Sequence, residues 1–171
     1  PELASLNTPY IDVSDLGDAI DMIRSVGELT GKKNESVRLI EDIEGAFKEL
    51  SQFVAHYSND LKSVLYLIWH KPNLAAGKNT FIDDMISQCG WANIIDEKRY
   101  PEASEIVTPE IVFLSSEPFP FKIKHVEMFE KIYPNAKIVL VDGEQFSWYG
   151  SKLKEAPYYF MDLIKELSTD C

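Results

Sequence analysis

The sequence predicts an α/β fold in which a parallel sheet follows one long helix. Three buried-strand patterns, at residues 63–68, 110–115 and 136–141, are separated by helical patterns. Short apolar runs of this kind are typical of parallel sheets that are covered on both faces. The third observation is an unusually long amphipathic segment, residues 34–57, which precedes all three strands. Together these patterns predict a Rossmann-like lobe behind a long helix.

The first 31 residues look like the end of another lobe. Residues 8–13 read as a short strand, and a helix capped by Ser14 or Asp15 follows through Val26. Gly31 stands at a plausible C-terminal cap position. A strand and a helix cannot form an independent core, so we expect residues 1–31 to be the tail of a mostly absent N-terminal α/β lobe.

The long helix is expected to connect two domains. Its apolar stripe recurs at three- and four-residue steps and comprises Val37, Ile40, Phe47, Leu50, Val54 and Tyr57. At about 1.5 Å of rise per residue it spans roughly 36 Å, more than a compact lobe of this size needs. We therefore divide the chain into the tail at 1–31, a connecting helix at 32–58 and a C-terminal ligand-binding lobe at 59–171.

Further elements complete the predicted lobe. A helix capped by Asn79 or Thr80 ends at Gly90, and Asn93–Ile95 adds a short strand. A crossover helix over residues 122–133 and a last helix over residues 157–167 follow. Asp142-Gly143 is read as a turn.

Composition excludes several classes of function. The net charge of −11 argues against nucleic acid and against an anionic membrane surface as partners. No apolar run reaches the length of a membrane span, so direct insertion is not expected. Cys89 and Cys171 form neither a disulfide framework nor a zinc pattern, and we predict no metal site and no cofactor. The chain begins at Pro1 without an initiator Met or a signal segment, so we expect it to be a fragment of a longer protein.

The candidate site lies where the predicted strands end. Parallel strands release all their carboxyl ends at one edge of the sheet, and ligands bind there. Aromatic, histidine and carboxylate side chains follow each strand and are expected around one crevice: Trp69, His70, Glu117, Phe119, Phe121, Glu144, Phe146, Trp148 and Tyr149. Such a crevice suits a large ligand that is flat or apolar.

The roles of these residues are open at this stage. Trp69 opens a Trp-His-Lys-Pro loop and favours binding, while His70 is either a metal or haem-iron ligand or a hydrogen-bonding group. Glu117 can accept hydrogen bonds from a ligand, form an ion pair with a cationic side chain of a partner, or cap its own loop. Phe119 and Phe121 either present their rings or anchor their loop. The remaining histidines, His56 and His125, are expected at the surface.

Two residues after the third strand suit stacking on a flat ligand. Of Trp148 and Tyr149, one ring is expected to pack inward. Glu144 is the other exposed carboxylate of this loop and a candidate for docking a partner.

Several blocks of residues resemble a known family. They are Gly27–Gly31, Ile68-Trp69 with Pro72, Ala76-Gly77, Thr80–Ile82, Tyr100–Glu102, Ser115–Phe121, Val141–Glu144 and Phe146–Ser151. In this order they resemble the C-terminal portion of bacterial ABC-transporter substrate-binding proteins of the cobalamin/iron-siderophore class, which have a helical backbone between their lobes.

The resemblance implies two α/β lobes that hold a ligand between them and deliver it to a membrane permease driven by an ATPase. The ligand is then a corrinoid such as cobalamin or an iron siderophore, with haem or another metal chelate as the alternative. Glu117 and Glu144 become candidates for docking the permease. The implied location is periplasmic, or extracellular and membrane-associated. A dimer formed through the surface left by the missing lobe is a further expectation.

An enzyme is the alternative from another class. Glu117 and Glu144, at the ends of neighbouring strands, resemble the acid/base pair of a small α/β hydrolase. However, Ser115-Ser116 lacks the Gly-x-Ser-x-Gly elbow, and no Gly-rich phosphate loop follows the first strand. The family resemblance also argues against the Glu117/Glu144 pair, and we predict that the protein is not an enzyme.

Overall fold

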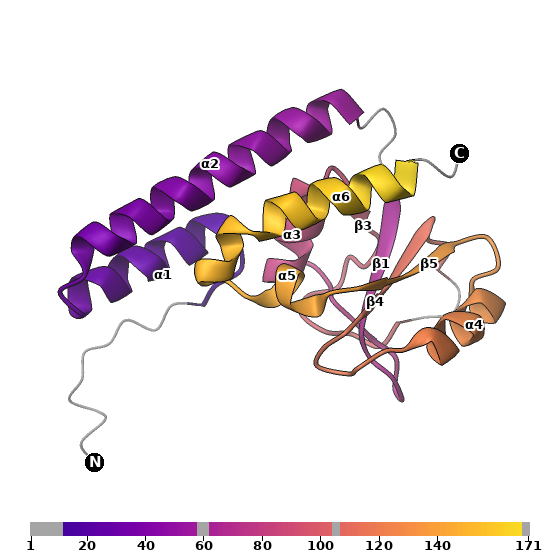
Figure 1. Cartoon of the computed structure of the whole chain (residues 1–171). Coiled ribbons are helices and arrows are strands. Elements are labelled where there is room, and N and C mark those ends of the chain that lie inside the picture. Colours follow the sequence, from indigo (N-terminus) through magenta and orange to yellow (C-terminus); the bar gives the residue numbers. More distant parts are fainter. Residues whose placement is uncertain (1–11, 58–61, 104–106, 169–171) are drawn as a thin grey trace, which may run out of the picture.

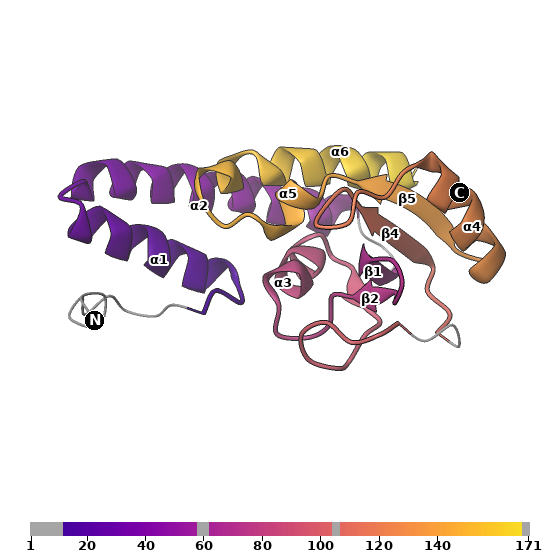
Figure 2. The ribbon, with the colours of Figure 1, turned by 90° about the horizontal axis from the view of Figure 1, so that it is seen from below.

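The computed structural model describes residues 12–57, 62–103 and 107–168. A helical arm, made of α1 (Leu16–Leu29) and α2 (Lys33–Tyr57), extends from a compact α/β lobe (Figure 1). Both views place α2 beside the C-terminal helix α6 (Ala156–Ser168), which joins the arm to the lobe (Figure 2). The predicted strand at 8–13 falls mainly outside the described residues, and its last two residues are not in a strand.

The arm is a helical hairpin whose ends follow local sequence signals. The Asp15 side chain accepts a hydrogen bond from the Asp18 backbone N–H and caps α1. At the other end Gly31 has a φ of +71°, a conformation that glycine adopts without steric cost. Helix α2 then runs without interruption from Lys33 to Tyr57, which confirms the predicted long helix.

A mostly parallel sheet forms the centre of the lobe. Its order is β2 (Leu74–Ala75), β1 (Ser63–Trp69), β4 (Ile111–Ser115) and β5 (Lys137–Val141), and β3 (Ala92–Asn93) also pairs with β1. Strands β1, β4 and β5 are parallel, as predicted. The antiparallel strand β2 was not predicted, because two residues are too few to show a hydrophobic period.

Alternate residues of the strands enter two separate cores. Tyr66 and Phe113 face the core beneath the arm, α3 (Phe81–Gln88) and α6. Leu65 and Leu67 face the opposite core, which is closed by α4 (Ile123–Ile132). The sheet is therefore covered on both faces, which explains its continuous apolar strands.

The segment after β5 differs from the turn that the sequence predicts. The Asp142-Gly143 turn is instead the start of a short helix, α5 (Gly143–Ser147), in which the Asp142 side chain accepts from the Glu144 backbone N–H at 3.1 Å. A Cβ atom at Gly143 would lie 2.4 Å from Ser115 Oγ and 2.7 Å from Glu117 Cγ. Glycine is therefore needed here for close approach to β4. A 3-10 turn, η2 (Ser151–Lys154), leads on to α6.

None of the helices in the described ranges combines the length and apolar character that a membrane span requires.

Two glycines of the arm provide a test of its packing. Gly45 lies inside α2 with open space around its Cβ position, so Gly45→Ala should raise the free energy of unfolding by about 1 kcal/mol. A Cβ at Gly27 would lie 2.1 Å from Ser36 Oγ, so Gly27→Ala should lower it by about 1–3 kcal/mol. Urea unfolding followed by circular dichroism measures both. Equal effects would contradict the close α1–α2 contact at Gly27.

Candidate functional site

The candidate site is the edge of the sheet at which β1, β4 and β5 end. Because these strands are parallel, the segments at residues 70–73, 116–122 and 142–150 all leave the sheet at this edge. The sequence analysis placed its candidate residues in these three segments. The structure separates them into an aromatic cluster after β1 and β4 and a second group around Trp148.

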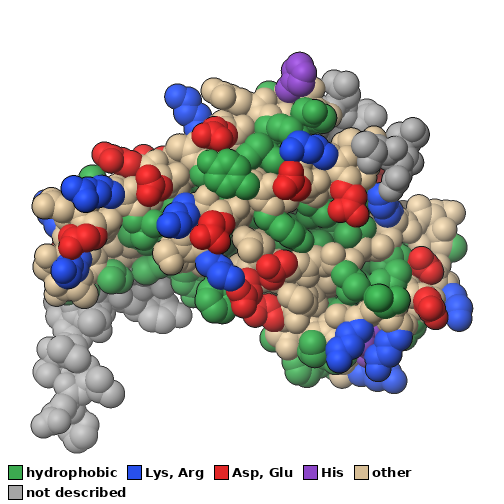
Figure 3. All heavy atoms as spheres, in the orientation of Figure 1, with side chains coloured by type: hydrophobic (Ala, Val, Ile, Leu, Met, Phe, Trp, Pro, Cys, Tyr) green, Lys and Arg blue, Asp and Glu red, His purple; other side chains and the backbone are tan. Residues whose placement is uncertain are grey.

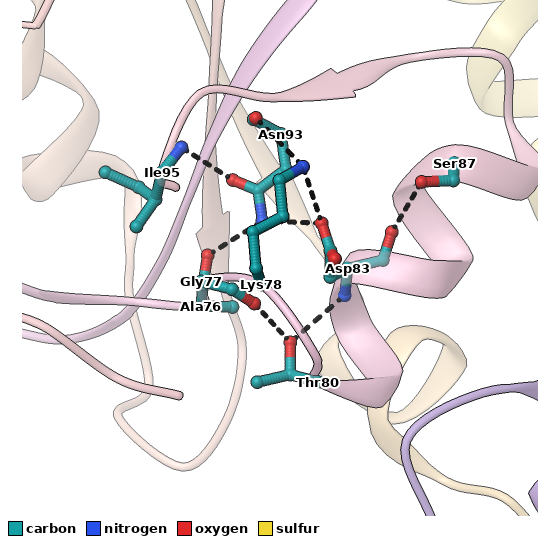
Figure 4. A network of polar contacts seen from close by, with 8 residues as sticks. All are labelled: Ala76, Gly77, Lys78, Thr80, Asp83, Ser87, Asn93 and Ile95. Atoms are coloured by element: carbon teal, nitrogen blue, oxygen red, sulfur yellow. Dashed lines mark hydrogen bonds and ion pairs between the residues drawn. The ribbon is translucent and has the colours of Figure 1, made fainter. Parts of the chain in front are cut away.

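A polar network fixes the return from the first segment to α3 (Figure 4). The Asn93 side-chain amide donates to Ala76 O at 3.0 Å and to Asp83 Oδ1 at 3.1 Å. Lys78 Nζ lies 3.3 Å from the same Asp83 oxygen. A Cβ at Gly77 would lie 2.0 Å from Glu97 O, so only glycine fits this path. The loop after β1 is thus anchored by α3 and β3.

Trp69 and Phe119 form the exposed part of the aromatic cluster. Trp69 is the last residue of β1, and its side chain is 41% exposed. Its ring centroid lies 5.7 Å from that of Phe119, in an edge-to-face arrangement. Phe119 also contacts the His70 ring at 5.8 Å. Rings from the ends of two neighbouring strands therefore meet, as the parallel topology predicts.

His70 is oriented by its neighbour Asn73. His70 Nδ1 lies 2.9 Å from Asn73 Oδ1, and because an amide oxygen only accepts hydrogen bonds, Nδ1 carries the proton. The Nε2 lone pair of His70 is then left to accept a proton or to bind a metal. This geometry keeps the role of metal or haem-iron ligand open for His70.

His125 was expected at the surface, but it is half-buried beside His70. Their ring centroids are 5.8 Å apart, and His125 Nδ1 accepts from the Lys122 backbone N–H at 2.8 Å. Burial lowers the pKa of His125, and the charges of Lys124, His70 and Lys122 lower it further. No local sequence pattern predicts this pairing, since the two histidines are far apart in the chain.

Positive charge gathers near this cluster although the chain carries a net charge of −11. Lys122 and Lys124 at the start of α4 are exposed and lie close enough to His125 to affect its pKa. Figure 3 shows a group of Lys or Arg side chains at the lower right of the view. An anionic group on a ligand would be attracted to this end of the lobe.

The second group is organised by Glu117. Its Oε1 atom accepts from Trp148 Nε1 at 2.8 Å and from Ser147 Oγ at 3.0 Å. The Lys152 ammonium lies 5.2 Å from the centre of the Trp148 ring and also forms an ion pair with Glu144, which raises the pKa of Lys152. Both carboxylates that the sequence analysis selected are therefore engaged around Trp148.

Trp148 and Tyr149 are 49% and 43% exposed, so neither ring is fully packed inward. Tyr149 leans on Phe81 of α3, with ring centroids 5.5 Å apart. Beside them lies a hollow of about 440 Å³, which is also lined by Met22 of α1 and by Gly150. The arm thus contributes a wall next to Trp148, which the sequence analysis did not foresee.

Two candidate residues are core residues instead. The Phe146 side chain is 0% exposed and packs against Tyr66 and Phe160. Helix α5 turns Phe146 inward on the same face as Gly143. Phe121 is 6% exposed and packs against Phe129. The prediction that Phe121 and Phe146 line an open crevice is contradicted by this burial.

Within residues 12–57, 62–103 and 107–168, no group of three or more His, Cys, Asp or Glu side chains could hold a metal ion. Cys89 is buried, and burial raises its thiol pKa, so it is not a reactive nucleophile.

Comparison with protein families gives a match over residues 4–117 to the periplasmic binding protein family. The chain belongs to this family. Its members are solute-binding proteins and not enzymes, which argues against the hydrolase alternative for Glu117 and Glu144. No curated protein sequence matches the chain.

Solved structures share the fold at low sequence identity. The periplasmic haem-binding protein BhuT, in complex with two haems, has a TM-score of 0.81 and 17% identity, over 96% of this chain and 68% of that chain. The periplasmic vitamin B12 binding protein BtuF of Vibrio cholerae has a TM-score of 0.77 and 17% identity, over 96% and 68%. Apo haem-binding RhuT from Roseiflexus sp. RS-1 has a TM-score of 0.76 and 17% identity, over 91% and 65%.

The chain thus spans about two thirds of the length of these structures. At such identities the likeness establishes the fold, while the ligands of those proteins differ among themselves.

The surroundings of His125 can be tested by titration. The pKa of His125 should lie below the ordinary 6.5. The stability that the neutral His125 side chain contributes is therefore present above pH 6.5 and is lost as the pH falls through the lowered pKa. Lys124→Gln should raise this pKa, because a nearby positive charge is removed. Proton NMR of the imidazole Cε1–H measures it, with Lys131→Gln in the last turn of α4 as the control. An equal rise in both variants would exclude a specific effect of Lys124.

Proposed function

We propose that this protein is the extracytoplasmic substrate-binding component of an ABC importer and that it captures a flat metal chelate. The main observation that supports this proposal is the exposed aromatic edge of a lobe that belongs to the periplasmic binding protein family. Trp69, Phe119, Trp148 and Tyr149 offer ring surface at the carboxyl ends of the parallel strands. A conjugated macrocycle or a catecholate gains both apolar burial and ring contact on such surfaces.

The proposed ligand is a corrinoid or an iron chelate, with haem as the alternative. The free Nε2 lone pair of His70 supports a ligand with a metal centre, since imidazole is a common ligand of iron and cobalt. The nearby Lys122 and Lys124 support a ligand that carries carboxylates, as haem does. Both features are compatible with binding between this lobe and a second one, with α2 as the rigid connection.

Delivery would bring the loaded protein to a permease at the membrane, from a periplasmic or extracellular, membrane-associated location. Glu117 and Glu144 are the proposed docking carboxylates. Their contacts with Trp148, Ser147 and Lys152 support this proposal, because they lie beside a ring that is proposed to bind the ligand. A basic side chain of a permease would therefore meet these carboxylates close to the bound ligand.

Self-association is a second candidate, and exposed apolar residues of the arm favour it. Val26, Leu29 and Val37 are 48%, 65% and 41% exposed. A concentration-dependent dimer in size-exclusion chromatography with light scattering would support it, and Leu29→Lys should shift that equilibrium toward monomer. A strict monomer at high concentration would exclude this candidate.

Ligand binding is tested by titrating the chain with haemin, cyanocobalamin and a ferric catecholate, each followed by Trp fluorescence and ligand absorbance. Trp69→Ala should weaken binding of the accepted ligand about tenfold, because an exposed ring contact is lost. Tyr158→Ala, which removes a similarly exposed ring from α6, is the matched control. Equal losses in the two variants would contradict a binding site at the sheet edge.

A further inference from the structure

We propose that Glu117 is a positioning residue, which holds the Trp148 indole in the orientation that a bound ligand meets. This inference rests on the proposed binding function, but its central contact can be tested without any ligand. It differs from the docking role considered above, because here Glu117 acts on another side chain of the same lobe.

The contact is a hydrogen bond from a half-exposed ring to a carboxylate. Trp148 Nε1 donates to Glu117 Oε1 at 2.8 Å, and Ser147 Oγ donates to the same oxygen at 3.0 Å. The Trp148 backbone N–H is held separately by Glu144 O at 3.0 Å. The backbone is thus fixed by α5, while the ring depends on Glu117 for its orientation. Hydrogen bonds to an ionised acceptor are the stronger kind.

Glu117 is itself well placed for this task. Its backbone N–H donates to Ser115 Oγ at 3.3 Å, while its carbonyl oxygen accepts from the same hydroxyl at 2.5 Å. The missing Cβ of Gly143 leaves room for the Glu117 side chain, since an added methyl group would lie 2.7 Å from Glu117 Cγ. The segment after β4 therefore lies close enough to α5 for the Glu117 carboxylate to reach the Trp148 indole. Support of this kind preorganises a binding surface.

A second charged side chain, that of Lys152, contacts the face of the Trp148 ring. Lys152 Nζ lies 5.2 Å from the centre of the Trp148 ring and pairs with Glu144. Glu117 holds the edge of the indole, and Lys152 covers part of its face. Trp148 is 49% exposed, and a flat ligand can contact the exposed part of its ring. A fixed ring loses less rotational freedom on binding than a mobile one.

The first experiment observes the contact itself in the ¹⁵N-labelled chain. The indole N–H signals of Trp69, Trp91 and Trp148 are assigned by Trp→Phe substitutions. In Glu117→Ala the Trp148 signal should move upfield and exchange faster with water, while that of the buried Trp91 stays in place. Glu117→Gln keeps an acceptor oxygen, so it should retain most of the protection. An unchanged Trp148 signal in Glu117→Ala would overturn the proposal.

The second experiment measures the affinity for whichever of haemin and cyanocobalamin the wild-type chain binds. Glu117→Ala should weaken binding about three- to tenfold, Glu117→Gln much less, and exposed Glu127→Ala on α4 not at all. In a Trp148→Phe background, Glu117→Ala should cause no further loss. An undiminished loss there would mean that Glu117 contacts the ligand directly and would overturn the positioning role. If neither probe binds, the proposed function fails, and the NMR result still decides whether Glu117 holds Trp148.

Discussion

The shared direction of β1, β4 and β5 is the constraint on which the rest of this structure depends. Strands β1 and β4 are buried on both faces, so polar groups and incompletely buried rings are best tolerated at their ends, while the edge strand β5 is only partly buried. Parallel pairing then gathers three chain segments at one edge. Trp69 meets Phe119 there because Leu67 pairs with Leu114 in the register of the two strands.

Hydrogen bonds and ion pairs of charged side chains orient the residues at this edge. In a chain with a net charge of −11, the carboxylates near the site are directed to specific partners. Glu117 accepts from the Trp148 indole, and Glu144 pairs with Lys152 above the same ring. A ring that is about half exposed thereby gains the fixed orientation that buried rings obtain from packing. The residues proposed for ligand binding and for docking consequently form one connected group.

The aromatic residues show which parts of the site local sequence can predict. Trp69, Phe119, Trp148 and Tyr149 were expected at the edge, and their side chains are partly exposed there. Phe146 was placed with them because α5 was read as a turn. In a helix, residues three apart share a face, so Phe146 follows Gly143 into the core. The partnership of His70 with His125 depends on the docking of α4, which no local pattern contains.

The sequence by itself determined the order of the elements, the long helix and the parallel sheet, because hydrophobic period, caps and strand length are properties of neighbouring residues. Membership of the periplasmic binding protein family is likewise carried by the sequence. Only the tertiary structure decided which rings remain exposed, and which partners hold Glu117, Glu144 and His125. Those outcomes arise from side chains that come together through packing, and such contacts leave no periodic trace along the chain.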